Sequence, residues 1–362
     1  MTSRRTALTG VLGWFAAAVL LGFALLLGFA RCAGPDDAPA PARTEPTAAP
    51  TLEPVAPGTF TLAVLPDSQY ATEAEVPAGE TALATQTAWL ADHADTLDLQ
   101  FVLHEGDLVD DACDPAQWER ASFALTTLDD AGIPYAVSAG NHDVRYYSAG
   151  PDACTDGDPV DHPDEFTTHV PLTTAQAMTT FGGSFSGTDT LSTFHTFEAG
   201  GEQFLVLALQ FGPTAPEADW ALQVAHDHAD HHAILLTHDL IGPDGELRGG
   251  ASTSTSALPK PPRLTGAQLW DRLVAPAPNV VLTLSGHVTE GTAGRSVAPD
   301  DAGRPVHRLL ANFQTLDGGR TGYLRLLTVD PAAGSIDVRT YSPVLDAWLT
   351  DDAHQFTLTD LW

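Results

Sequence analysis

The sequence predicts an α/β protein in which short buried strands alternate with amphipathic helices. Five short apolar runs have the length of strands, and four of them are rich in Val, Ile, Leu or aromatic residues, as buried strands are. The runs occupy positions 60–65, 101–103, 135–137, 234–236 and 280–284. The segments that separate them carry apolar residues at helical spacing. Strands that alternate with helices in this way build layered α/β folds.

The elements between and after these strands follow from their own periodicities. Apolar residues recur every three or four positions over 118–128 and again over 82–90, which predicts two amphipathic helices. The runs 194–197 and 204–209, joined across Gly200–Gly201, predict a β-hairpin. We therefore expect helices on both sides of the second strand and a hairpin in the second half.

Two longer regions complete the predicted domain. The polar stretch Tyr146–Asp189 is too long for an ordinary connector and predicts a lid or specificity insertion. The last third carries three further strand-like runs, near Val306–Leu310, Tyr323–Val329 and Ile336–Tyr341, which we expect to be antiparallel. We find no internal repeat.

The N-terminal region predicts a membrane anchor followed by a tether. Residues 7–30 carry no charge and are long enough, at about 36 Å, to cross a ~30 Å hydrocarbon core. More arginine precedes this segment than follows it, so residues 1–6 are expected in the cytoplasm. Residues 31–58 include seven prolines after Cys32 and predict an extended linker of roughly 80 Å. The folded domain then covers 59–362.

A cleaved signal peptide is the competing interpretation of the same segment. Ser3-Arg4-Arg5 weakly matches a twin-arginine signal. Against cleavage, the apolar run is longer than a usual signal core, and the small-residue site Ala38-Pro39-Ala40 is followed by Pro41. We therefore expect a single-pass protein of the cell membrane whose domain faces away from the cytoplasm.

The charge of the chain restricts its partners. The formal net charge is −31 at neutral pH. A surface this acidic repels polyanions, so a nucleic-acid partner is not expected. The sequence does not indicate an oligomeric state.

Metal-ligating residues follow each of the five predicted strands. The first run leads to Asp67, the second to Gly106–Asp107 and the third to Gly140–Asp143, while the last two lead to His238 and His287. Side chains at the ends of neighbouring strands converge on one edge of a sheet. Carboxylates, an amide and imidazoles together predict a site for two divalent cations. This pattern favours a metal-dependent hydrolase.

The order and residues of these motifs resemble those of the calcineurin-like metallophosphoesterases, from about Phe60 to Tyr341. The matching pieces are Asp67-Ser68-Gln69, Gly106-Asp107-Leu108-Val109-Asp110, Gly140-Asn141-His142-Asp143, His238 and Gly286-His287-Val288-Thr289. The resemblance implies two packed mixed sheets flanked by helices in four layers. It also implies a phosphoesterase that acts on a small-molecule or cell-envelope phosphomonoester or phosphodiester.

The resemblance assigns a role to each matching residue. It implies that Asp107 bridges two cations, that Asp67 binds the first, and that Asn141, His238 and His287 bind the second. Two such cations, ~3.5–4 Å apart, bridge a hydroxide and clamp the phosphoryl oxygens. It further implies that His142 acts near the leaving group, with Asp143 orienting its imidazole.

Two positions depart from the family pattern and change the first metal site. Gln69 and Thr289 stand where the family has histidines. Oxygen ligands favour harder ions, so we expect Mn²⁺ or Mg²⁺, whereas an imidazole-bearing site favours Fe or Zn. Glu290, next to Thr289, has two interpretations: a carboxylate ligand that compensates for the missing histidine, or a solvated acid of the loop. Either the two metal sites differ and the first binds its ion weakly, or the first ion is lost. The rival function is therefore a catalytically weak or inactive metal-binding module.

Other polar clusters carry weaker predictions. The histidines at 226, 228, 231 and 232 predict a solvated helix end rather than a zinc site, and His104 is expected behind the ligands. The acids between Asp156 and Glu165 lack the spacing of a calcium loop. Cys113 and Cys154 follow two of the motif loops, so a disulfide between them is expected in an oxidising compartment.

Overall fold

The computed structural model describes residues 47–48, 52–73, 80–144, 164–249 and 262–362. The predicted cytoplasmic segment, the anchor 7–30 and most of the predicted linker lie outside these ranges. Within them, none of the helices is both long and apolar enough to cross a bilayer.

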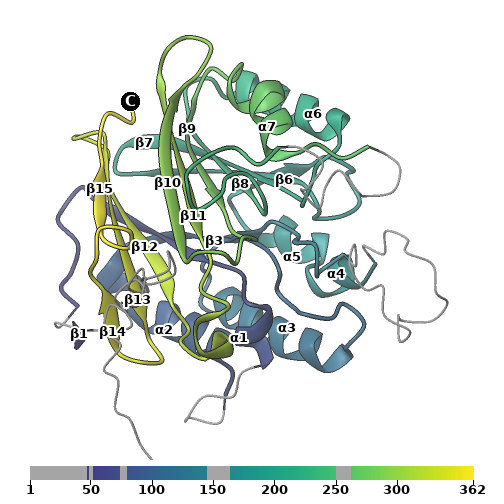
Figure 1. Cartoon of the computed structure of the whole chain (residues 1–362), viewed down its shortest axis with the longest axis vertical. Helices are drawn as coiled ribbons and strands as arrows, with labels where there is room; N and C mark the ends of the chain where they lie inside the picture. Colours follow the sequence, from purple (N-terminus) through teal and green to yellow (C-terminus); the bar gives the residue numbers. More distant parts are fainter. Residues whose placement is uncertain (1–46, 49–51, 74–79, 145–163, 250–261) are drawn as a thin grey trace, which may run out of the picture. The chain divides into compact units, whose positions relative to one another are not determined.

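The first sheet joins both ends of the described domain (Figure 1). Its central strand β2 (Phe60–Leu65) pairs in parallel with β3 (Leu99–His104), which pairs in parallel with β4 (Tyr135–Val137). On its other side, β2 pairs antiparallel with β12 (Leu324–Asp330). The sheet continues antiparallel through β13 (Ser335–Ser342), β14 (Ala347–Leu349) and β1 (Thr47–Ala48), and β15 (Phe356–Leu358) also pairs with β13.

The second sheet is built from the middle of the chain. Four of its strands are parallel neighbours, in the order β11 (Pro305–Ala311), β9 (Val280–Ser285), β8 (His232–Thr237) and β7 (Glu202–Leu209). Antiparallel strands close both sides: β10 (Ala293–Pro299) beside β11, and β6 (Thr193–Ala199) and β5 (Phe181–Ser184) beyond β7.

Helices cover the outer face of each sheet (Figure 1). Those on the first sheet are α1 (Gln69–Glu73), α2 (Ala82–Leu97) and α3 (Pro115–Asp130), with α4 (Asp164–His169) and α5 (Leu172–Ala177) beside them. Those on the second are α6 (Ala215–Asp227), α7 (Gly266–Leu269) and the π-helical turn η2 (Trp270–Val274). A short 3₁₀ turn, η3 (Leu316–Gly319), lies between β11 and β12.

Strand alternation divides the core into three layers. Along β2, Ala63 and Leu65 pack with α2 and α3, whereas Phe60, Leu62 and Val64 face the space between the sheets. Along β7, even-numbered residues fill that same inner layer and odd-numbered ones pack under α6 and η2. Because successive strand residues point to opposite faces, the fully apolar strand runs require covering layers on both faces. The predicted four-layer architecture is therefore confirmed.

The individual elements agree with the sequence prediction, with two corrections. The predicted helices are α2 and α3, and the predicted hairpin is β6–β7. The prediction for Val306–Leu310 is wrong in part: this strand is antiparallel to β10 but parallel to β9, in the second sheet. The described part of the predicted lid, from Asp164 onward, forms α4, α5 and β5, and Phe166 of α4 is buried against Trp118. That part is a packed portion of the domain because its apolar side chains join the core.

Candidate metal centre

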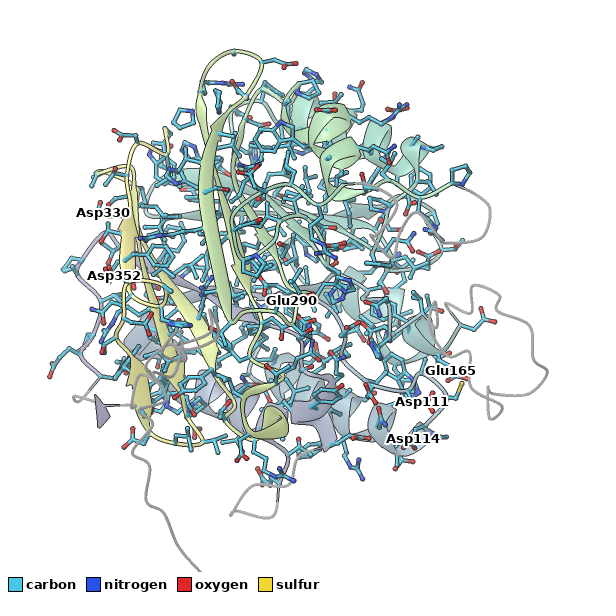
Figure 2. The ribbon with its side chains drawn as sticks, in the orientation of Figure 1. Asp111, Asp114, Glu165, Glu290, Asp330 and Asp352 are labelled. Atoms are coloured by element: carbon cyan, nitrogen blue, oxygen red, sulfur yellow. The ribbon has the colours of Figure 1, made fainter. Side chains whose placement is uncertain are left out.

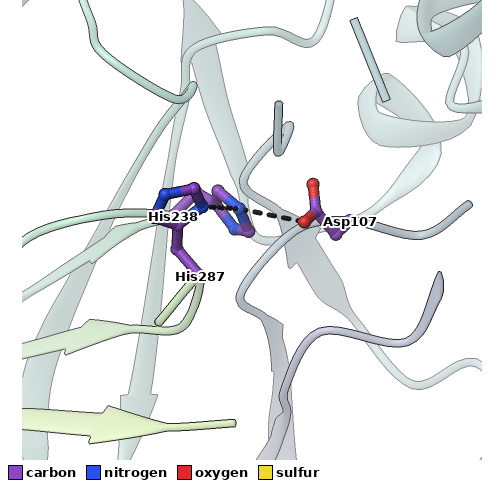
Figure 3. Close-up of side chains that lie close together, drawn as sticks. All are labelled: Asp107, His238 and His287. Carbon is purple, nitrogen blue, oxygen red and sulfur yellow. Dashed lines mark hydrogen bonds and ion pairs between the residues drawn. The ribbon is translucent and has the colours of Figure 1, made fainter. Parts of the chain in front are cut away.

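The candidate metal centre lies where strands from both sheets end. Asp67 and Asp107 follow the parallel strands β2 and β3 of the first sheet, while His238 and His287 follow β8 and β9 of the second. One donor atom each from Asp107, His238 and His287 falls within 4.8 Å of the others (Figure 3). The sequence prediction that these side chains converge is confirmed, but they meet between two sheets instead of along the edge of one.

His238 stands at the centre of the cluster and is fully buried. Its Nδ1 lies 2.7 Å from the backbone carbonyl oxygen of Glu105, so Nδ1–H donates there and Nε2 faces the cluster. Nε2 lies 3.0 Å from Asn141 Oδ1, 3.2 Å from Asp107 Oδ2 and 3.2 Å from His287 Nδ1. A ring held by its second nitrogen in this way has the orientation typical of metal-ligating histidines.

Two glycines allow the carboxylates to approach. A Cβ atom on Gly286 would lie 1.9 Å from Asp67 Oδ2, and one on Gly140 would lie 2.1 Å from Asp107 Oδ1. The Asp67 carboxylate then accepts the backbone N–H of His287 at 2.9 Å and 3.0 Å. These two motif glycines are therefore required by space, since any side chain would displace a candidate ligand.

The donor set fits a divalent cation. The oxygens of Asp67, Asp107 and Asn141 surround His238 Nε2, and a neutral ring offers them no hydrogen there. Although burial opposes the charged ring, the carboxylates of Asp107 and Asp67 raise the pKa of His238 to about 10. Burial raises the pKa of Asp67 to about 7, and neighbouring Asp107 acts in the same direction. The buried oxygens thus require either a proton on His238 or a cation among them, which is the property of a metal site.

The structure corrects the predicted partner of His142. The imidazole Nδ1 lies 2.7 Å from the backbone oxygen of Asp110 and 3.3 Å from its carboxylate. Asp143 is buried and instead accepts the backbone N–H groups of Gly140 and Val109, at 2.8 Å and 3.2 Å. Asp143 therefore shapes the two motif loops, and Asp110 orients the imidazole. The sequence carried a signal for Asp110, because it is the last residue of the second motif.

The two unusual positions of the first site differ in the structure. Gln69 is buried, and its Oε1 has no hydrogen-bond partner among the described residues. An orphaned buried amide oxygen two residues from Asp67 fits an oxygen ligand for a hard cation. Thr289 and Glu290 are exposed, and the structure shows no hydrogen bond from either side chain to the cluster within the described residues. Their roles as ligands stay predictions.

Behind the ligands, a neutral histidine joins two of the motif loops. His104 Nδ1 accepts the Gly106 N–H at 3.1 Å, and its Nε2 lies 2.9 Å from Ser68 Oγ. Burial lowers the pKa of His104 to about 3, so the ring is uncharged at neutral pH. Both ring nitrogens of His104 thus contact the motif loops, and its predicted supporting role stays a prediction.

The remaining sequence candidates do not add a second metal site in the part of the chain that the structure describes. There, the Asp107 group is the one cluster of His, Cys, Asp or Glu with metal-ligand spacing, so the histidines at the end of α6 form none. His228 Nδ1 contacts the Val224 carbonyl oxygen, and His231 contacts Asp230. Cys113 is disulfide-bonded. Cys154, its predicted partner, lies outside the described residues together with Asp156, so that pairing stays a prediction.

The raised pKa of His238 predicts a pH-dependent stability of the metal-free protein. A group whose pKa rises on folding contributes stability that is lost as pH increases toward the folded value. For His238 that window extends from about 6.5 to about 10. We expect the free energy of unfolding of chelator-treated protein to fall by about 2 to 3 kcal/mol between pH 7 and pH 9. Saturating Mn²⁺ should abolish this fall in stability, because the cation replaces the proton on His238. Urea unfolding at each pH, with and without Mn²⁺, measures the free energy of unfolding in both states. An equal fall in His238→Gln would contradict this assignment.

Known proteins match both the sequence and the fold. Residues 60–290 match the family model of calcineurin-like phosphoesterases. A relative from Bacillus subtilis (strain 168), the uncharacterized protein YvnB, is 32% identical over 262 residues, which are 71% of this chain but 18% of the relative. The chain thus spans less than a fifth of that relative's length. A crystal structure of a dimetal phosphatase from Danio rerio shares the fold at a TM-score of 0.50 and 14% identity, covering 83% of this chain and 99% of that one.

The fold and the cluster therefore define the class of α/β proteins that carry a candidate metal cluster where the strands of two packed sheets end. Within that class, the match over residues 60–290 places this chain in the calcineurin-like phosphoesterase family.

Proposed function

We propose that this protein is a phosphoesterase that hydrolyses phosphomonoesters or phosphodiesters with two divalent cations. The observation that carries the proposal is the convergence of Asp67, Asp107, Asn141, His238 and His287 on one point at the strand ends. A second feature supports catalysis: His142 stands beside this cluster, partly exposed, with its Nδ1 side fixed by Asp110.

The cations, when bound, supply an activated water and neutralise charge on the phosphoryl group. Asp67, Asp107 and Gln69 would hold the first, while Asp107, Asn141, His238 and His287 would hold the second. The tight loops Gly106–Asp107 and Gly140–Asn141 keep these side chains in place before substrate arrives. Such preorganisation lowers the reorganisation needed during reaction.

His142 is positioned to handle a proton at the leaving group. Its Nδ1–H donates to the Asp110 carbonyl oxygen, which leaves Nε2 on the opposite side of the ring. Burial opposes its positive charge, but the negative charges of Asp107 and Asp110 raise the pKa of His142 above its ordinary value. These charges favour the imidazolium form, which a general acid requires. The side chain is 29% exposed, so a substrate can reach it.

Activity should depend on hard cations. Because the first site offers oxygen donors in place of imidazoles, we expect turnover with Mn²⁺ or Mg²⁺ to exceed turnover with Zn²⁺. The test is hydrolysis of bis(p-nitrophenyl) phosphate and p-nitrophenyl phosphate by chelator-treated protein across a panel of metals, with bound metal measured. Purified protein that holds two tight zinc or iron ions would contradict the metal preference. Absence of turnover on both substrates with every metal would contradict the proposed function.

A catalytically weak metal-binding module is the alternative. The exposed position of Thr289 favours it, because the first site then lacks one protein ligand of the family pattern. This alternative predicts one bound Mn²⁺ per chain and no turnover. Metal stoichiometry measured together with the hydrolysis assay separates the two functions.

We further propose that residues 7–30 anchor the protein in the cell membrane with the domain outside the cytoplasm. The uncharged segment and the arginines before it support this placement. Expressed protein should remain in the membrane fraction after an alkaline carbonate wash and keep its N-terminus. A mature chain that begins after Ala33 and is found free in the medium would show that the segment is a cleaved signal.

A further inference from the structure

The peptide group that holds His142 is itself held by a glutamine outside the motifs. Gln117 lies in the first turn of α3 and is 3% exposed. Its Oε1 accepts two backbone N–H groups of the loop before that helix, from Asp110 at 2.8 Å and from Asp111, labelled in Figure 2, at 3.0 Å. The Asp111 N–H and the Asp110 carbonyl belong to one peptide group, and that carbonyl oxygen accepts His142 Nδ1–H at 2.7 Å. Gln117 therefore fixes the peptide group that orients the imidazole.

A carboxylate completes this chain of hydrogen bonds. Glu73, the last residue of α1, accepts Gln117 Nε2–H at 2.5 Å. The order is thus carboxylate, side-chain amide, peptide group and imidazole, and each group donates a hydrogen bond to the one before it. Because aligned hydrogen bonds polarise one another, each bond strengthens the next. The chain ends at the imidazole of His142, which it joins to both α1 and α3.

An amide is the group that fits the place of Gln117. On one side it meets two backbone N–H groups, which donate, and on the other a carboxylate, which accepts. A carboxylate at this position would face Glu73 with no hydrogen between them, and an apolar side chain would remove the acceptor of both N–H groups. The amide also has one orientation, since exchange of Oε1 and Nε2 would set donor against donor. The residue type at position 117 is therefore explained by the peptide group that it holds.

We propose that Gln117, anchored by Glu73, is a positioning residue that keeps His142 aimed at the leaving-group oxygen of the substrate. The inference rests on the proposed function, in which the imidazole acts as the general acid. In that step the bond between phosphorus and the leaving oxygen breaks, and the proton of His142 Nε2 passes to that oxygen. Water supplies the hydroxyl group on phosphorus and the proton that restores the imidazolium.

The nature of the leaving group reveals whether His142 is well aimed. Phenol, with a pKa of about 10, is a poor leaving group that needs a proton as the bond breaks. The much more acidic p-nitrophenol leaves as an anion and needs little help. A misplaced imidazole should therefore slow the hydrolysis of a phenyl ester more than that of a p-nitrophenyl ester, whereas a general loss of structure should slow both equally.

The test measures Mn²⁺-loaded Gln117→Leu on phenyl and p-nitrophenyl esters of phosphate, or of methyl phosphate if the protein hydrolyses diesters alone. We expect kcat for the phenyl ester to fall about 10-fold, the factor that corresponds to one hydrogen bond, and kcat for the p-nitrophenyl ester to fall less than about 3-fold. KM and bound Mn²⁺ should stay unchanged, because the hydrogen bonds of Gln117 go to the loop and to Glu73. The control is Gln268→Leu, since Gln268 Oε1 accepts the Thr265 backbone N–H at 3.0 Å at the start of α7. It should lower the melting temperature and change neither kcat.

A double-mutant cycle shows whether Gln117 acts through the imidazole. In a His142→Ala background, Gln117→Leu should lower kcat for the phenyl ester no further, because no ring is left to aim. A purely structural role would lower it in both backgrounds. An exchange of the two groups, Gln117→Glu together with Glu73→Gln, keeps the order of donors and acceptors. This exchange variant should retain kcat for the phenyl ester within about 3-fold of the unmodified protein.

Three results would overturn the inference while leaving the proposed function intact. These are equal losses of kcat on the two esters, the same loss in the His142→Ala background, and an exchange variant as slow as Gln117→Leu. Should Gln117→Leu not fold, Glu73→Ala replaces it, because Glu73 is exposed and its removal opens one end of the chain. We then expect kcat to fall about 3-fold for the phenyl ester alone, and an unchanged value would overturn the inference. If the unmodified protein hydrolyses none of these esters with any metal, the proposed function itself fails, and this inference with it.

Discussion

Replacing Asp107 by Asn is expected to lower kcat/KM by about 10³-fold or more. The Asp107 carboxylate contacts both sides of the cluster, since Oδ1 accepts the His142 N–H at 2.9 Å and Oδ2 lies 3.2 Å from His238 Nε2. An amide keeps the size and one oxygen but removes the charge that, in the proposed function, would hold two cations. A bound metal pair would stabilise the transition state by several kcal/mol. A loss of about 4 kcal/mol of that stabilisation corresponds to a 10³-fold fall in rate.

The measurement needs controls that separate chemistry from folding. Circular dichroism should show that the metal-free variant is folded, because the amide oxygen introduced by Asp107→Asn still accepts the His142 backbone N–H. Its melting temperature should fall, because the charge that stabilises protonated His238 is lost. Bound Mn²⁺ should fall below two ions per chain. A matched substitution, Asp219→Asn, removes an exposed carboxylate on α6 and should leave kcat/KM unchanged. Retention of more than a tenth of the activity by Asp107→Asn would show that this residue does not bridge the metals.

Replacing Gly286 by Ala is expected to abolish tight metal binding and to lower kcat/KM by about 10²-fold or more. The added methyl group would lie 1.9 Å from Asp67 Oδ2, so either the carboxylate or the loop must move by about 1 Å or more. Displacements of that size at a catalytic group cost about 10²-fold in rate. The Asp67 carboxylate would also lose the hydrogen bonds that it accepts from the His287 backbone N–H, which fix the Gly286–His287 loop.

A glycine elsewhere serves as the comparison. Gly187 has φ of +71° and nothing within 4 Å of an added Cβ. Gly187→Ala should therefore cost about 1 kcal/mol of stability through backbone strain, with no change in metal content or activity. If Gly286→Ala binds Mn²⁺ as tightly as the unmodified protein, then Asp67 does not occupy the position described above.

The sequence by itself determined the layered α/β class and the location of most candidate ligands. The apolar runs that become β2, β3, β8 and β9 show the strands directly, because a strand covered on both faces is apolar throughout. Asp67, Asp107, His238 and His287 then follow at the strand ends, where local sequence alone places them. The helices α2 and α3 were equally accessible, since their periodicity reflects a single buried face.

Only the tertiary structure decided how these pieces meet. Nothing in the local pattern of β11 shows that it pairs in parallel with β9, because pairing is a choice between distant segments. The same holds for the site: the cluster forms between two sheets, and Asp110 and not Asp143 orients His142. These contacts depend on backbone carbonyl oxygens, on the paths of loops and on buried charges. Residue types at fixed spacings therefore specify which chemistry is present, and long-range packing specifies which atoms carry it out.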